Sequence, residues 1–275
     1  MLRKYTVKNI YITALRSIYT NRRIIPPLTK REIYGRYQGS ILGLLWSFLN
    51  PIIMLIVYTF VFSVIFKAKW GATSESRVEF AIILFIGLII YNVFAEMISR
   101  SPSLITSNVN FVKKVVFPIQ VLPIIALGTT IFHMVISFTV WLIAYILFFG
   151  IPNYTIIYFP IIIIPLCLFS LGFSWFLASL GVYLRDLSQI VGLFTTILMF
   201  LSPIFYPITA LPPTFQKILH LNPLTFLIEE ARSILMWGNT PDWPTLLYVT
   251  LASVIVACLG LGWFEKTKSG FADVL

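Results

Sequence analysis

Seventy consecutive residues, 115–184, contain no Asp, Glu, Lys or Arg. Soluble domains carry charge on about a quarter of their residues, so a run of this length excludes a soluble fold. Because about 20 apolar residues cross the hydrocarbon core of a bilayer as a helix, the run has room for two membrane spans and the turn between them. Of the 275 residues, 59% are hydrophobic and only 11% are charged. The sequence therefore predicts an all-α, polytopic membrane protein.

Six apolar segments are predicted to be transmembrane helices. The predicted spans are residues 37–66, 80–99, 121–149, 158–184, 188–204 and 244–264. Small and polar residues recur at steps of three and four in two of them: Tyr37, Ser40, Gly43, Ser47 and Asn50, and then Ser188, Gly192, Thr195, Met199 and Ser202. Such a face either packs closely against another helix or lines a path through the membrane, and both interpretations stay open.

The span at residues 158–184 has a different pattern of small residues. Ser170, Ser174, Ala178 and Gly181 lie along one face and predict a packing seam. His133, alone in apolar surroundings, is interpreted as a hydrogen-bonded residue between helices rather than a ligand. Glu96 and Arg100 are four residues apart, and we favour an interfacial ion pair over a proton relay.

Two further segments are predicted to lie at the membrane surface. Residues 1–36 combine bases with an apolar stripe that is followed by a break at Pro26 and Pro27, a pattern typical of an amphipathic interface helix. Residues 205–243 hold two short helices, 211–221 and 224–237, that are too short or too charged to span. Together they predict a re-entrant helical hairpin before the last span.

The charge distribution predicts the orientation. The net charge is +10, and nine of the 20 Lys and Arg lie in residues 1–40. With both termini in the cytoplasm, the inner segments hold 15 of the 20 bases, as the positive-inside rule requires. The remaining bases are scattered at span ends, so we interpret them as orientation signals and contacts to lipid headgroups, and not as a nucleic-acid surface.

Motifs for chemistry are missing from the chain. It contains no GxxxxGK[ST] nucleotide-binding motif, and its acidic residues are isolated except for Glu229 and Glu230. Cys167 and Cys258 lie in apolar runs without a second ligand at metal-binding spacing. We therefore predict no catalytic residue, no metal site and no cofactor in this chain, so energy either comes from a partner protein or is unnecessary.

Three stretches carry a family resemblance: YGRYQGSILGLLWSFLNP at residues 34–51, NVNFVKKVVFPIQVLP at 108–123 and YLRDLSQIVGLFTTILMFLSPIFYP at 183–207. Together they resemble the membrane subunit of an ABC-2 type polysaccharide exporter, above all the O-antigen/lipopolysaccharide export permeases and their teichoic acid and capsule relatives. Residues 211–235 are similar to the same family, so the resemblance extends over nearly the whole chain.

The resemblance implies a single ABC-2 transmembrane domain over residues 1–275, in a multi-pass protein of the bacterial inner membrane. It implies a homodimer with two cytoplasmic ATP-binding cassette subunits, which would bind ATP and Mg in place of this chain. The substrate would be a polysaccharide linked to undecaprenyl diphosphate. Alternatives are export of teichoic acid, capsule, lipid or drug. An integral-membrane lipid glycosyltransferase, from a different class, is disfavoured by the scarcity of acidic residues.

The resemblance also implies roles for particular residues. The candidates for substrate binding, at the cytoplasmic gate and along the channel, are Arg22, Arg23, Lys30, Arg31, Arg36, Tyr37, Trp46, Phe194 and Phe200. The candidates for coupling to the ATPase are Asn108, Asn110, Lys113, Lys114, Arg185 and Asp186. Residues 205–243 would form the outer, periplasmic gate.

For each group a simpler interpretation stays open. The bases would merely fix topology, the aromatic residues would face lipid or the core, Arg185 and Asp186 would form a local salt bridge, and the hairpin would be a packing lid.

Overall fold

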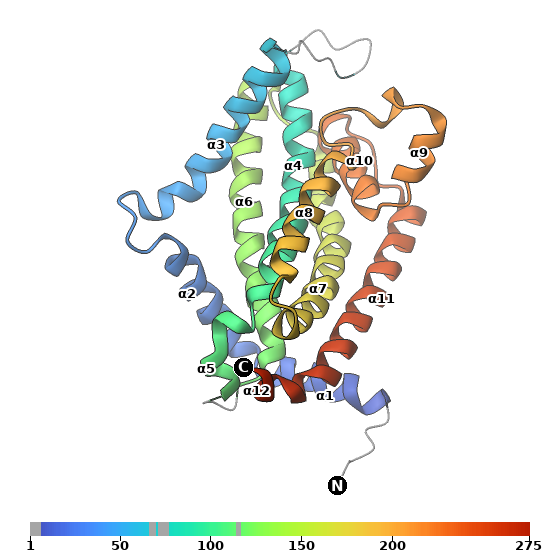
Figure 1. Cartoon of the computed structure of the whole chain (residues 1–275). Helices are drawn as coiled ribbons and strands as arrows, with labels where there is room; N and C mark the ends of the chain where they lie inside the picture. Colours follow the sequence, from blue (N-terminus) through green and yellow to red (C-terminus); the bar gives the residue numbers. More distant parts are fainter. Residues whose placement is uncertain (1–6, 66–69, 71–76, 114–116) are drawn as a thin grey trace.

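The structure is a computed structural model that describes residues 7–65, 70, 77–113 and 117–275. Throughout the described part of the chain the regular structure is helical (Figure 1). The α-helices are α1 (Val7–Thr20), α2 (Ile25–Tyr37), α3 (Trp46–Tyr58), α4 (Arg77–Arg100), α5 (Val109–Lys113), α6 (Leu122–Phe149), α7 (Phe159–Tyr183), α8 (Leu187–Phe200), α9 (Pro213–Leu219), α10 (Pro223–Met236), α11 (Trp243–Thr267) and α12 (Phe271–Val274).

Five helical segments within the described residues are long and apolar enough to cross a membrane. They are Gly43–Phe62, Val78–Ser103, Ile119–Phe149, Tyr154–Tyr183 and Trp243–Val274. The remaining predicted span corresponds to α8, whose 14 residues give a length of about 21 Å, less than the roughly 30 Å of a hydrocarbon core. Residues 201–206 after it are not helical, so the helix predicted to continue to residue 204 ends four residues earlier.

The predicted start of the first span is wrong. α2 ends at Tyr37, and the chain turns through Gly39 and Gly43, whose φ angles are 85° and 50°. Glycine adopts positive φ readily and other residues do not, so these two positions interrupt the helix. The apolar segment then begins at Gly43 as a 3₁₀ turn that leads into α3. Tyr37 and Ser40 therefore do not share a helix face with Ser47 and Asn50.

The prolines of the amino-terminal region begin a helix and do not end one. α1 stops at Thr20, and α2 starts at Ile25 with proline in its first turn. The fixed φ of proline suits that position, where its missing N–H would have no partner in the helix. The segment predicted as one interface helix is therefore two helices with a short 3₁₀ turn, Arg22–Ile24, between them.

Different helices lie at the two ends of the molecule. Figure 1 shows both chain termini at one end, together with α1, α5 and α12, while α9 and α10 lie at the opposite end. The turn after α6 is at that opposite end as well, because a Cβ on Gly238, just after α10, would lie 2.6 Å from the Nδ2 atom of Asn153. The predicted coupling segment and the predicted outer gate are thus at opposite ends of the bundle.

Helices α7 and α11 meet backbone to backbone. A Cβ built on Gly260 would lie 2.0 Å from the carbonyl oxygen of Gly172, so neither glycine leaves room for a side chain. On α7 the predicted packing seam is confirmed, since Ser170, Ser174, Ala178 and Gly181 are all buried. Small residues allow such close approach of membrane helices.

The seam on α7 also holds the start of the loop after α4. A Cβ on Gly181 would lie 2.0 Å from the carbonyl oxygen of Pro102, in the 3₁₀ turn η4 (Ser101–Ser103). Beside it the Ser101 hydroxyl donates to Ser174 Oγ at 2.7 Å. The loop that leads to α5 is therefore anchored on α7 at its first residues.

Helices α9 and α10 are confirmed as two short helices, but α10 is part of the core. Nine of its residues are buried, and Arg232 has no exposed side-chain surface. The Arg232 guanidinium donates to the carbonyl oxygens of Ile83, Pro203 and Ile204 and to the Glu229 carboxylate. The charge that indicated an interfacial position is thus satisfied inside the protein.

Candidate functional site

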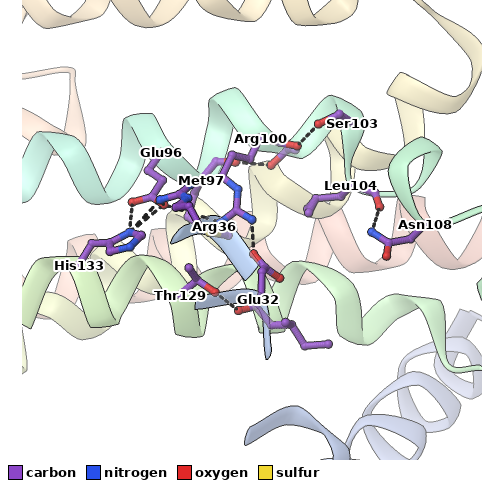
Figure 2. Close-up of polar contacts among 12 residues, drawn as sticks. Glu32, Arg36, Glu96, Met97, Arg100, Ser103, Leu104, Asn108, Thr129 and His133 are labelled. Atoms are coloured by element: carbon purple, nitrogen blue, oxygen red, sulfur yellow. Dashed lines mark hydrogen bonds and ion pairs between the residues drawn. The ribbon is translucent and has the colours of Figure 1, made fainter. Parts of the chain in front are cut away.

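Six polar side chains gather where α2 crosses α4 and α6, and we call them the charge cluster. Figure 2 labels all of them except Tyr37. Its members are Glu32, Arg36 and Tyr37 from α2, Glu96 and Arg100 from α4, and His133 from α6. The contacts between α2 and the other two helices join residues that are 60 or more positions apart in the sequence. The contact between Glu96 on α4 and His133 on α6 joins residues 37 positions apart. The cluster therefore exists only in the folded molecule.

Glu96 is the centre of the charge cluster. Arg36 Nη1 donates to Glu96 Oε1 at 2.7 Å, and His133 Nδ1 lies 3.0 Å from both carboxylate oxygens. On the other side of the imidazole ring, Tyr37 Oη lies 3.1 Å from His133 Nε2. With the imidazole proton on Nδ1, Nδ1–H donates to Glu96 and Nε2 accepts from the Tyr37 hydroxyl. Arg36 Nη1 also lies 3.0 Å from Nδ1, and in this tautomer it donates to the same carboxylate and not to the ring.

The state of Tyr37 agrees with this arrangement. Burial of the ring and hydroxyl raises the pKa of Tyr37 above its ordinary value. The Tyr37 hydroxyl therefore stays protonated at neutral pH and can donate a hydrogen bond to His133 Nε2.

Arg100 joins the second carboxylate of α2 to the cluster. Its Nη2 donates to Glu32 Oε1, while its Nη1 lies 3.7 Å from Glu96 Oε1, within ion-pair range but too far for a hydrogen bond. The predicted pairing of Glu96 with Arg100 is confirmed, although Arg36 is closer to Glu96. The interpretation of His133 as an interhelical hydrogen-bonded residue is confirmed as well.

A cavity of about 570 Å³ extends from the charge cluster along α3 and α4. At one end it is lined by Arg36, Tyr37, Glu96, Arg100 and His133. Along α3, α4 and α8 the lining becomes mainly apolar, with Met54, Tyr58, Phe85, Leu88, Ile89 and Met199. The cavity thus has a charged end and a largely apolar body.

The two predicted polar stripes have different roles. On α3, Ser47 and Asn50 line the cavity, which fits the interpretation of a lined path as far as this subunit is concerned. In the second stripe, Thr195 on α8 and Ser202 just after α8 are buried. The Thr195 carbonyl accepts from the Tyr91 hydroxyl, and Ser202 Oγ accepts from Asn222 Nδ2 at 3.1 Å. Only Met199 of that stripe faces the cavity.

The other four predicted gate bases are exposed on the Arg22–Ile24 turn and on α2. The Arg22 guanidinium lies 3.9 Å from the Tyr19 ring centre, and the Lys30 ammonium lies 5.9 Å from that of Tyr34. Arg23 is exposed too. The Arg31 guanidinium is 5.8 Å from the ring centre of Phe111 in α5. The structure thus separates these four bases from Arg36, which points into the charge cluster.

Of the predicted channel aromatics, Tyr37 lines the cavity and the other three do not. Trp46, on α3, and Phe194 and Phe200, on α8, are exposed, and none of the three lines the cavity. The Phe200 ring packs at 5.8 Å from that of Phe205, between ring centres. The three residues lie on surfaces of α3 and α8 that this chain leaves uncovered.

The predicted coupling residues lie at the end of the molecule that holds both termini (Figure 1). Asn108 is used structurally, since its Nδ2 donates to the Leu104 carbonyl at 2.9 Å, whereas Asn110 and Lys113 are exposed. Lys114 lies outside the described residues. Arg185 and Asp186 are exposed in the turn between α7 and α8, and no ion pair joins them, so the salt-bridge interpretation of that turn is wrong.

Sequence reasoning missed the partners of Arg36. It did not single out Glu32 and did not connect Arg36 with Glu96 or His133. A signal was present: Glu32 and Arg36 have the same four-residue spacing and the same order of charge as Glu96 and Arg100. Two helices with that pattern are complementary when they run antiparallel.

Comparison with known protein families gives the affiliation of the chain. Residues 27–236 match the family model of the ABC-2 type transporter. The chain belongs to the ABC-2 type transporter family. The matched region begins in the first turn of α2 and ends with α10, so it includes the charge cluster, the cavity and the predicted coupling segment.

Individual ABC-2 relatives match nearly end to end. The O-antigen export system permease protein RfbA of Myxococcus xanthus is 28% identical over 264 residues, which cover 95% of this chain and 99% of the relative. RfbA of Klebsiella pneumoniae is 28% identical over 251 residues, covering 90% and 93%. The polysialic acid transport protein KpsM of Escherichia coli is 24% identical over 249 residues, covering 89% and 93%.

Proposed function

We propose that this chain is the membrane-spanning permease of an ABC exporter that moves a lipid-linked polysaccharide, such as an undecaprenyl-diphosphate-linked O-antigen, from cytoplasm to periplasm. The observation that carries the proposal is the end-to-end match to an O-antigen export permease, which leaves 1% of that relative uncovered. A capsular polysaccharide is the second candidate, because KpsM aligns over 89% of this chain.

The proposed assembly is a homodimer of six-span subunits, with both termini in the cytoplasm and two cytoplasmic ATP-binding cassette subunits. Support for a second copy comes from the uneven burial of the spans. In an 18-residue apolar stretch of Gly43–Phe62 only 6% of the residues are buried, against 78% in the corresponding stretch of Val78–Ser103. An apolar helix with so few buried residues faces lipid or another subunit. The same helix, α3, carries Trp46 as well as Ser47 and Asn50, which line the cavity.

At the cytoplasmic gate, we assign attraction of the diphosphate to the exposed bases Arg22, Arg23, Lys30 and Arg31. Guanidinium groups bind phosphate oxygens through paired hydrogen bonds, and an exposed base is free to do so. Arg36 and Tyr37 are occupied by Glu96 and His133, so they contact the substrate only when those bonds open. In the channel we assign Trp46, Phe194 and Phe200 to stacking on sugar rings.

The proposed docking surface for the ATPase is formed by α5 and the turn at Arg185 and Asp186. Asn110 and Lys113 support this assignment because they are exposed at the end opposite to α9 and α10. That opposite end, residues 205–243, is the proposed periplasmic gate. Charged groups on an exposed surface help to orient a partner, mainly by raising the association rate.

The transport proposal is tested by deletion and complementation in the native host. Deletion is expected to leave undecaprenyl-linked polymer inside the cytoplasmic membrane, and the intact gene is expected to restore surface polymer. Chemical analysis of the retained polymer distinguishes O-antigen from capsule. Normal surface polysaccharide of both kinds in the deletion strain would refute the proposal, and sugar transfer by the purified chain alone would favour the glycosyltransferase alternative.

The docking proposal is tested by copurification of the ATPase subunit. Lys113→Ala combined with Asn110→Ala is expected to reduce the amount of ATPase bound per permease. Lys217→Ala is the matched control, because Lys217 is an exposed lysine on α9 at the opposite end. Equal recovery of the ATPase with both variants would remove α5 from the docking surface.

A further inference from the structure

Helices α2 and α4 carry the same charge pattern and face each other in opposite directions. Glu32 and Arg36 are one helical turn apart on α2, and Glu96 and Arg100 are one turn apart on α4. Arg36 pairs with Glu96 and Glu32 pairs with Arg100, so the pairing order is reversed between the helices (Figure 2). We call these four residues the charge lock.

The pattern permits only one register. If α2 slid along α4 by one turn, about 5.4 Å, either Arg36 would face Arg100 or Glu32 would face Glu96. Each shift would destroy both opposite-charge pairs and create one like-charge pair, which is unfavourable at this range. The two helices are therefore matched at one position and repelled at the two neighbouring positions.

A third helix fixes the same position of α2. His133 of α6 is hydrogen-bonded to Glu96 and Tyr37 and thus links both helices of the charge lock. One to two turns away, a Cβ on Gly128 of α6 would lie 2.9 Å from the Oγ1 and Cγ2 atoms of Thr29. The close approach at Gly128 depends on α2 remaining in this register.

The charge lock is only partly buried. The side chains of Arg36 and Glu96 are 37% and 20% exposed, and those of Arg100 and Glu32 are 25% and 29% exposed. Ion pairs that keep part of their hydration lose less on separation than fully buried pairs. The two ion pairs thus select one register of α2 on α4 and can still separate.

We propose that Glu96, Arg100 and His133 are positioning residues, which hold α2 in one register on α4 and α6 through its Glu32, Arg36 and Tyr37. The helix that carries Lys30 and Arg31 is kept at a defined place next to α5, where the Arg31 guanidinium lies over the Phe111 ring. Opening of the charge lock and of the hydrogen bond between Tyr37 and His133 frees Arg36 and Tyr37 at the charged end of the cavity.

A disulfide between α2 and α6 measures the register directly. The Cβ built on Gly128 lies 3.5 Å from the Thr29 Cβ, which suits a disulfide. The test chain carries Thr29→Cys and Gly128→Cys, with both native cysteines replaced by serine. The full chain is oxidised in native membranes, and the cross-linked share of the intact chain is measured by reactivity of the remaining thiols. Normalising to intact chain separates a register change from loss of protein.

The expected result is efficient cross-linking with the native charges and about fivefold less with Arg36→Glu or Glu96→Arg alone, since one kcal/mol corresponds to such a factor. The combined exchange Arg36→Glu with Glu96→Arg restores the pair with reversed polarity and is expected to restore cross-linking. Arg16→Glu, a reversal on the exposed surface of α1, is the control and is expected to leave it unchanged.

Three results would overturn the inference. Full cross-linking in both single reversals would mean that the charges do not set the register. No recovery in the double exchange would mean that Arg36 acts through a partner other than Glu96. Equal loss from Arg16→Glu would mean that the assay reports net charge. If a reversal prevents accumulation of the chain, Arg36→Lys and Arg36→Gln decide instead, with cross-linking expected for lysine and reduced for glutamine. None of these readouts depends on export, so they stand apart from the proposed function.

Discussion

Replacing Arg232 by alanine is expected to destabilise the subunit by about 3 kcal/mol. The fully buried guanidinium donates four hydrogen bonds, at 2.6 Å to Pro203 O, 2.9 Å to Ile204 O, 3.2 Å to Ile83 O and 2.8 Å to Glu229 Oε1. The Ile83 carbonyl lies within α4, so the carbonyls left without a partner are those of Pro203 and Ile204. Each costs about 1–3 kcal/mol when buried and unpaired.

Two other contributions act in opposite directions. Truncation leaves a space beside Trp70, whose ring centre is 4.3 Å from the guanidinium carbon, and this adds to the loss. Removal of a buried cation relieves its desolvation and partly offsets the loss. Glu229 is 29% exposed and can be hydrated instead. The net value of about 3 kcal/mol allows for this compensation.

The assay is the free energy of unfolding of the purified chain, from SDS titration in mixed micelles followed by tryptophan fluorescence. Arg232→Lys keeps the charge but offers one nitrogen, so it is expected to lose about half as much. Arg16→Ala is the control on an exposed surface and is expected to stay within about 0.5 kcal/mol of the native chain. A change of that small size for Arg232→Ala would show that the hydrogen bonds to the loop carbonyls do not stabilise the fold.

Further substitutions test the packing and the helix ends by the same titration. Gly260→Ala is expected to destabilise by about 2–3 kcal/mol, because its Cβ would meet the Gly172 carbonyl oxygen at 2.0 Å. Gly192→Ala is the matched control on α8, where no atom lies within 4 Å, and it is expected to be neutral or stabilising; an equal loss would contradict the packing argument. Asn222→Ala is expected to cost about 1–2 kcal/mol, since its side chain accepts from Leu224 N at 3.0 Å and caps α10; an unchanged midpoint would argue against the cap.

Much of the architecture was accessible from local sequence patterns. Uncharged runs located α4, α6, α7 and α11 to within a few residues of their ends, because apolar length and helix length coincide when a helix is bounded by charges or turns. The seam on α7 followed from the spacing of Ser170, Ser174, Ala178 and Gly181, all of which are buried. The two short helices before α11 followed from proline positions, which mark where helices begin.

The first span shows where an apolar pattern is insufficient. The uncharged run starts at Tyr37, but the membrane-length helix starts at Gly43. Gly39 and Gly43 were the available signal, and reading Gly43 as a small packing residue concealed its role in the turn. The absence of charge shows which segments can enter a bilayer, whereas residues with positive φ determine where a helix is interrupted.

The charge cluster was beyond reach for a different reason. Arg36 and Glu96 are separated by 60 residues in the chain, and Glu32 and Arg100 by 68. Local spacing gave the pair of Glu96 with Arg100, whose 3.7 Å separation is the longest ion pair of the cluster. Which helices meet depends on tertiary packing, and a single sequence carries that information only as complementarity between distant patterns.

The backbone contact of Gly172 with Gly260 limits how this subunit can change shape. With no side chains between them, α7 and α11 have no compressible layer that would let one rotate or slip past the other. In any opening or closing movement we expect α7 and α11 to move together as one rigid unit. The deformation then falls to the sparsely covered α3, and to the irregular chain after α8.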